Sequence, residues 1–161
     1  MARTGTIHDP RNAFARITYA SVLFEQNRIN EGLGTLKSAM EMRTDSRFIQ
    51  TCLGLMVWYR LDGDQMKTAM PDRVAPHLEL ADYQLSRGDV EGAEASYMRA
   101  LSHLNKEDQV NRRYFVKVHR FFMDKKAYEK ALLVVELGMK YLPEDRHLHR
   151  LAENLEKMGK H

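Results

Sequence analysis

Three cationic residues share a spacing that could bind an anion. Arg113, Lys117 and Arg120 lie at positions i, i+4 and i+7, which fall on one stripe of an α-helix. Cations on one stripe repel each other unless an anion compensates, and Arg can hold a carboxylate through two parallel hydrogen bonds. The spacing therefore indicates a partner-binding site for an acidic segment or a C-terminal carboxylate. The alternative is a solvent-exposed face whose charge is compensated by Glu79, Asp82 or Asp124.

A second candidate surface is apolar. Residues 48–61, FIQTCLGLMVWYRL, form the most apolar segment of the chain. Within it we expect Trp58, Tyr59, Leu55 and Phe48 to form a partner-binding patch, because exposed aromatic patches mark interaction sites. The alternative is that these side chains pack beneath the irregular segment 62–76.

No residue pattern indicates catalysis or metal binding. His147 and His149 are two positions apart, a spacing that points their side chains apart on a helix. The sequence contains no HExxH or CxxC ligand set, the patterns that would indicate zinc. Cys52 is the only cysteine and stands in an apolar stretch, which predicts a buried, unreactive thiol. We predict no catalytic residues, no metal and no cofactor, and hence a protein that is not an enzyme.

Length and composition bound the remaining possibilities. The chain has 161 residues, 43% hydrophobic and 29% charged, with a net charge of +3, which is ordinary for one globular or repeat domain. No run of five or six like charges occurs, so no nucleic-acid partner is expected. No apolar run approaches the roughly 20 residues of a membrane span. The single cysteine favours a reducing compartment. We expect a cytoplasmic protein, or a periplasmic one if the chain is part of a larger exported or membrane protein.

The elements that would position these residues are helical hairpins. Segments 76–105 and 115–143 each contain a helix of apolar spacing, a short polar turn (SRGD or MDKK) and a second helix. The second helices share a spacing, in which a small residue is followed by a larger one after four residues and by another small one three residues later. A small residue can lie where two helix axes approach closely. These positions are Ala93, Tyr97 and Ala100 in the first segment, and Ala131, Val135 and Gly138 in the second.

This pattern resembles the tetratricopeptide repeat, W-x2-L-G-x2-Y…A-x3-F…P. Leu80, Ala81, Ala93 and Tyr97 match it in one copy, and Phe115, Phe122, Ala131 and Pro143 match it in the other. His119 departs from it, since a small residue is usual there. A weaker copy contains Ala20, and Leu53-Gly54 provides another leucine–glycine pair, with Gly54 34 residues after Ala20. That spacing is the repeat length of the family.

The resemblance implies an all-α, right-handed solenoid of antiparallel hairpins. We predict a flexible arm over 1–10, in which Asp9-Pro10 can start a helix, and one domain over 11–161. Within it we expect four hairpins and a capping helix, at approximately 11–44, 45–73, 74–106, 111–143 and 145–160. Pro71 truncates the second hairpin, and 105–111 carries about four extra residues. Thr44-Asp45-Ser46 is expected to cap a helix and Asp62-Gly63-Asp64 to form a turn.

The resemblance also implies a function. First helices of such hairpins line a concave groove that takes peptides or partner helices. We therefore predict a non-catalytic scaffold that binds another protein in this groove. The first alternative is self-assembly, with homodimers formed through the Trp58 region or a terminal helix. The second is RNA binding, which would need basic residues along several hairpins.

Overall fold

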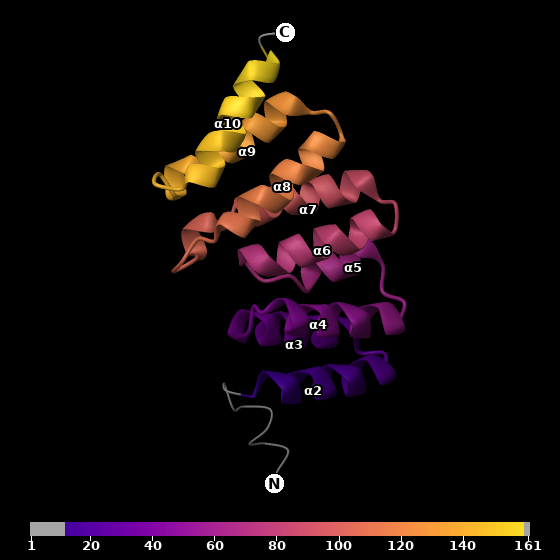
Figure 1. Ribbon diagram of the computed structural model, residues 1–161. Coiled ribbons are helices and arrows are strands. Elements are labelled where there is room, and N and C mark those ends of the chain that lie inside the picture. Colours follow the sequence, from indigo (N-terminus) through magenta and orange to yellow (C-terminus); the bar gives the residue numbers. More distant parts are fainter. Residues whose placement is uncertain (1–11, 160–161) are drawn as a thin grey trace. The chain divides into compact units, whose positions relative to one another are not determined.

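The computed structural model describes residues 12–159. Over this span the chain contains nine α-helices, one short 3-10 helix (η1, Leu104–Lys106) and no strand, which confirms the predicted all-α class (Figure 1). The predicted arm and the Asp9-Pro10 helix start lie outside the described residues. The α-helices are α2 (Ala13–Glu25), α3 (Ile29–Met42), α4 (Ser46–Trp58), α5 (Gly63–Thr68), α6 (Val74–Ser86), α7 (Val90–Leu101), α8 (Arg112–Asp124), α9 (Tyr128–Tyr141) and α10 (Arg146–Gly159).

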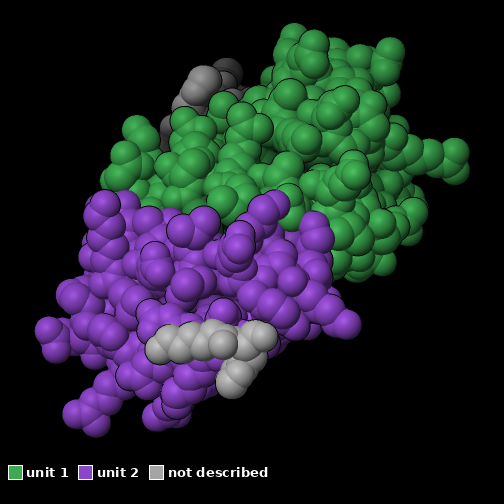
Figure 2. Space-filling model, turned by 90° about the horizontal axis from the view of Figure 1, so that it is seen from above, with its two compact units in different colours: residues 1–106 green, residues 107–161 purple. Residues whose placement is uncertain are grey.

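The chain divides into two compact units, Met1–Lys106 and Glu107–His161 (Figure 2). The boundary falls in the 105–111 segment, where the sequence predicts extra residues. In unit 1, α2 packs on α3, α6 packs on α7, and α4 contacts both α3 and α6. In unit 2, α9 contacts both α8 and α10. A single continuous domain over 11–161 stays a prediction.

The same turn follows the first helix of all four predicted hairpins. Two residues beyond α2, α4, α6 and α8, the backbone has a positive φ between 58° and 81°. These residues are Asn27, Arg60, Gly88 and Lys126. The next amide then donates to a carbonyl five residues earlier, as Arg28 N does to Leu23 O at 2.8 Å and Ala127 N to Phe122 O at 2.8 Å. This closure satisfies carbonyls at a helix end, and it occurs even though only one of the four residues is glycine.

Asn or Asp side chains cap five of the helices, α2, α4, α5, α7 and α8. Asp45 accepts a hydrogen bond from Phe48 N at 3.2 Å, which confirms the predicted cap of α4. Asp62 likewise caps α5, and the Gln65 side chain bonds back to the Asp62 amide. The predicted turn at Asp62-Gly63-Asp64 is therefore wrong. Asp62 with Gln65 three residues later forms a capping box, which starts a helix instead.

The second helices repeat one packing register. In α3, α7 and α9 the fourth, eighth and eleventh residues are all buried. At Gly138 a Cβ atom would lie 2.8 Å from Phe115 Cγ and 3.0 Å from Leu148 Cδ1, so a larger residue there would force these side chains to shift. Pro143 follows the C-cap of α9, outside the helix, and is exposed. The buried residues at these three positions of α3, α7 and α9 are Gly32, Leu36, Ala39, Ala93, Tyr97, Ala100, Ala131, Val135 and Gly138.

The helix that follows α4, in the segment predicted to hold a truncated hairpin, is short. Helix α5 has only six residues and packs against α3. Met66 and Met70 occupy the fourth and eighth positions counted from its start, and both are buried. Met70 precedes Pro71, and a residue before proline is disfavoured in helical geometry, so the helix cannot continue through it.

The first helices share a register that corrects one prediction. Ala20, Leu53, Ala81 and His119 are each the eighth residue of their helix. Ala20 and Ala81 are fully buried, and Leu53 is 5% exposed. Gly54, predicted to be the equivalent small residue, is one position further on and is exposed. One residue is about 100° of helix rotation, so Gly54 turns away from the joint to which Ala20 and Ala81 contribute.

Candidate functional site

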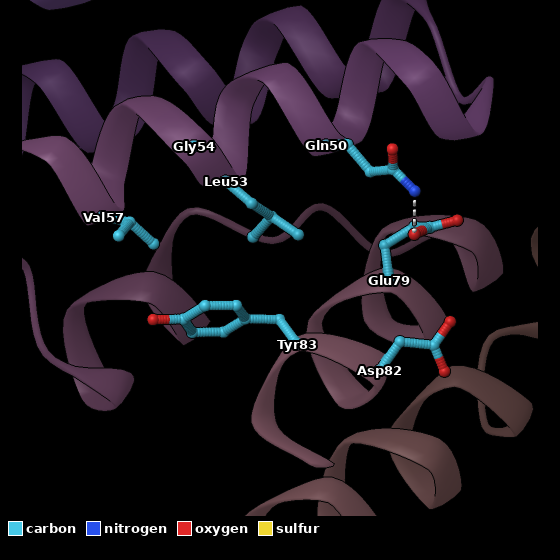
Figure 3. A pocket seen from close by; sticks show the side chains of 7 residues that line it. All are labelled: Gln50, Leu53, Gly54, Val57, Glu79, Asp82 and Tyr83. Carbon is cyan, nitrogen blue, oxygen red and sulfur yellow. Dashed lines mark hydrogen bonds between the residues drawn. The ribbon is translucent and has the colours of Figure 1, made fainter. Parts of the chain in front are cut away.

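The side of α4 that carries Gly54 faces α6 across an open pocket of about 360 Å³. The two helices are the first helices of the second and third predicted hairpins. Helices of this type are the ones that the tetratricopeptide resemblance predicts to line a groove. We call this pocket the α4–α6 groove. Its lining residues are Gln50, Leu53, Gly54 and Val57 from α4, and Glu79, Asp82 and Tyr83 from α6 (Figure 3).

One part of the groove is apolar. The side chains of Leu53 and Val57 extend from α4 toward the ring of Tyr83 (Figure 3). Val57 is 41% exposed, so an apolar side chain of a partner could cover it. A Cβ atom added at Gly54 would meet no other atom within 4 Å. The missing side chain at Gly54 therefore keeps the groove open along α4.

The other part is acidic. The Glu79 carboxylate accepts hydrogen bonds from Ser46 Oγ at 2.6 Å and from Gln50 Nε2 at 3.3 Å. Asp82 accepts one from Tyr97 Oη at 2.6 Å. Burial and this hydrogen bond to Asp82 both raise the pKa of Tyr97 above its ordinary value, so Tyr97 stays a neutral donor. The Glu79 carboxylate is oriented by neutral groups, and no Lys or Arg is among the described residues that line the groove.

Trp58 lies at the end of α4 and is 77% exposed. It follows Gly54 by four residues, so the two positions share one side of the helix. Trp58 therefore continues the stripe that Gln50 and Gly54 contribute to the groove. Its exposure leaves the indole available to a partner.

The other members of the predicted apolar patch do not share this exposure. Phe48 is 1% exposed and packs edge-on against Phe14, with ring centroids 5.2 Å apart. Leu55 packs partly buried against the same core. Phe48 and Leu55 are seven residues apart on the side of α4 that faces the interior, whereas Trp58 lies on another side. The prediction that Phe48 forms a surface patch with Trp58 is wrong.

Tyr59 is anchored to helix α2. Its hydroxyl lies 2.6 Å from Glu25 Oε1 and 3.1 Å from Ser21 Oγ, and its ring centroid lies 5.3 Å from that of Phe24. The hydrogen bond to Glu25 raises the pKa of Tyr59. Tyr59 therefore holds the end of α4 in place, and Trp58 alone of the four predicted aromatic and aliphatic residues is prominently exposed.

The predicted basic stripe lies in unit 2. Arg113, Lys117 and Arg120 all lie within α8, and the two arginines are exposed. The neighbouring Arg112 is paired with Asp145, with Nε and Oδ2 2.7 Å apart. Helical geometry thus brings the three cations onto one stripe, while Trp58 and the α4–α6 groove belong to unit 1. Anion binding by the stripe stays a prediction.

Three further possibilities concern the described part of the chain: a reactive thiol, a metal site and a membrane-spanning helix. Cys52 is buried, as predicted, and burial raises the pKa of its thiol to about 12. Between residues 12 and 159, no three His, Cys, Asp or Glu side chains come close enough to hold a metal ion. None of the helices in the same span has the length and apolar character needed to cross a bilayer.

Most of the groove was not predicted from the sequence. Glu79 and Asp82 entered only as counter-charges for the basic stripe, and Gly54 only as a packing residue. A signal was present, because the lining residues of α4 and of α6 each follow helical spacings of three and four. The spacing within each helix did not predict that α4 and α6 lie side by side. Comparison of the chain with protein-family models and with curated proteins found no match.

Proposed function

We propose that this chain is a tetratricopeptide-like helical repeat that acts as a non-catalytic protein-interaction module. In this proposal a segment of another protein docks in the α4–α6 groove. The observation that carries it is the groove itself, which combines an exposed apolar surface with two oriented carboxylates between two first helices. We also propose that the hairpins stack into a right-handed solenoid.

Two repeated features support the repeat assignment. The same positive-φ turn closes the first helix of every hairpin, including the truncated one. The second helices α3, α7 and α9 bury the same three positions. A fold built from one supersecondary unit repeated along the chain is expected to show such features.

The groove is suited to binding because its walls are already fixed. Leu53 and the buried face of α4 belong to the core of unit 1, and the Tyr59 hydroxyl ties the end of α4 to Glu25 on α2. A rigid surface loses little conformational entropy when a partner docks. We expect Trp58 to act as an apolar anchor beside the groove, since aromatic residues dominate many interfaces.

The test is quantitative affinity capture from lysate with wild type, Gly54→Gln and Gly34→Gln. Both glycines are exposed, lie inside helices and have no atom within 4 Å of an added Cβ, but only Gly54 lines the groove. We expect a partner captured by wild type and by Gly34→Gln to be lost with Gly54→Gln. Equal capture by all three proteins would contradict docking in the groove.

A further inference from the structure

The charges of the α4–α6 groove define the chemistry of its occupant. Glu79 accepts hydrogen bonds only from the neutral groups of Ser46 and Gln50, and it forms no salt bridge with another residue in the described span. These bonds fix the direction of the carboxylate without neutralising its charge. Glu79 therefore presents a preoriented negative charge at the edge of an apolar groove.

A cationic side chain complements this arrangement. Arg can donate two parallel hydrogen bonds to a carboxylate, and its aliphatic stem can lie on apolar surface. Glu79 and Tyr83 are four residues apart on α6, which places the acidic and apolar parts about one helical turn, or roughly 5 Å, apart. Two side chains on one face of an extended or helical segment have a comparable separation.

Resting on the proposed function, we propose that the groove binds a segment of another protein that pairs an arginine or lysine with a neighbouring apolar side chain. The cation contacts Glu79, and the apolar side chain covers Val57 and Tyr83 beside the buried Leu53. This is the opposite of the acidic segment predicted for the α8 stripe.

The probe for this proposal is a phage-displayed library of random 16-residue peptides selected on the full chain. We expect the enriched peptides to contain Arg or Lys next to an apolar residue. A fluorescently labelled enriched peptide should lose at least roughly tenfold in affinity on Glu79→Gln, since a hydrogen bond to a charged group is lost. Its binding should also weaken between 50 and 500 mM NaCl, because salt screens exposed charge pairs. Gly34→Gln should bind as wild type does.

The outcomes separate this inference from the proposed function. Peptides that need an open Gly54 but bind Glu79→Gln as tightly as wild type would overturn the cationic partner and leave groove binding intact. Peptides that bind Gly54→Gln as tightly as wild type would overturn both. Sedimentation equilibrium provides the third arm. Self-association of the wild type that is abolished by Glu79→Gln would assign the groove to a second copy of this chain and overturn the separate partner.

Discussion

Glycines in two regions of the molecule have opposite surroundings. At Gly138 in α9, an added Cβ would lie 2.8 Å from the ring of Phe115 and 3.0 Å from Leu148, both of which are fully buried. At Gly54 in α4, an added Cβ would meet nothing within 4 Å. The first glycine lets the chain pack against itself, and the second leaves open a surface that the chain does not fill. The same residue type in a helix therefore marks either a closed joint or an accessible groove, and only its neighbours decide which.

The largest expected effect comes from placing a charge in the closed region. Ala131→Asp should lower the free energy of unfolding by about 3–5 kcal/mol, because an unpaired charge would be buried. Gly54→Asp should change it by less than about 1 kcal/mol, as is usual at exposed positions. Urea unfolding followed by circular dichroism measures both. A loss of similar size at the two positions would remove the distinction between joint and groove.

The stability of the protein should depend on pH through a buried histidine of unit 1. His77 is 3% exposed and stacks on His103, with ring centroids 5.1 Å apart. Burial and the nearby His103 and Arg99 lower the pKa of His77 from 6.5 to about 4, although Asp72 opposes the shift. Because the unfolded chain binds the proton more tightly, this contribution to stability is complete above pH 6.5 and is lost as the pH falls toward 4.

The loss between pH 7 and pH 4.5 should be roughly 2–3 kcal/mol from this group. The measurement is urea unfolding of wild type and His77→Phe at the two pH values. Other groups titrate in both proteins, so the difference between the two losses isolates His77. An identical loss in wild type and His77→Phe would show that His77 does not couple folding to pH.

Replacing each of the two glycines by alanine should change the stability of the protein in opposite directions. Gly138→Ala should destabilise the protein by about 1–2 kcal/mol, because overpacking against Phe115 and Leu148 exceeds the gain in helix propensity. Gly54→Ala should stabilise it by about 0.5–1 kcal/mol, since nothing opposes that gain. Thermal unfolding of both variants gives the two signs directly. A destabilised Gly54→Ala would indicate that the groove is closed in solution.

The smallest effect is expected at the exposed aromatic. Trp58→Ala should change the free energy of unfolding by no more than about 0.5 kcal/mol, because the side chain is 77% exposed. Phe48→Ala, ten residues earlier on the same helix, should cost about 3–5 kcal/mol. Chemical unfolding of the pair checks whether Trp58 is a surface residue. A loss above 2 kcal/mol on Trp58→Ala would place it in the core.

Much of the fold was predictable because its signals are local. The spacing of Ala93, Tyr97 and Ala100 identified a buried helix face, and Pro71 set the limit of α5. The position of Gly54 was misassigned because the leucine–glycine pair fits the family pattern one residue away from the actual register. That register is set by packing of α4 against α3 and α6, which involves residues distant in sequence.

The site was less predictable, because it also depends on packing between residues that are distant in sequence. Apolar character alone did not separate Phe48, which faces the interior, from Trp58, which faces solvent. The acidic residues of α6 gained meaning only when α4 was placed opposite them. Charge on one helix was readable from spacing, as on α8, but a groove between two helices depends on how those helices pair.

Docking in the α4–α6 groove is tested most directly by a chemical-shift map of the isotope-labelled full chain titrated with an enriched peptide. We expect the amides that shift most to lie at Gln50–Val57 in α4 and Glu79–Tyr83 in α6, with smaller changes in α8. Shifts concentrated at Arg113–Arg120 instead, with the α4 and α6 amides unchanged, would contradict the assignment of the α4–α6 groove as the docking site.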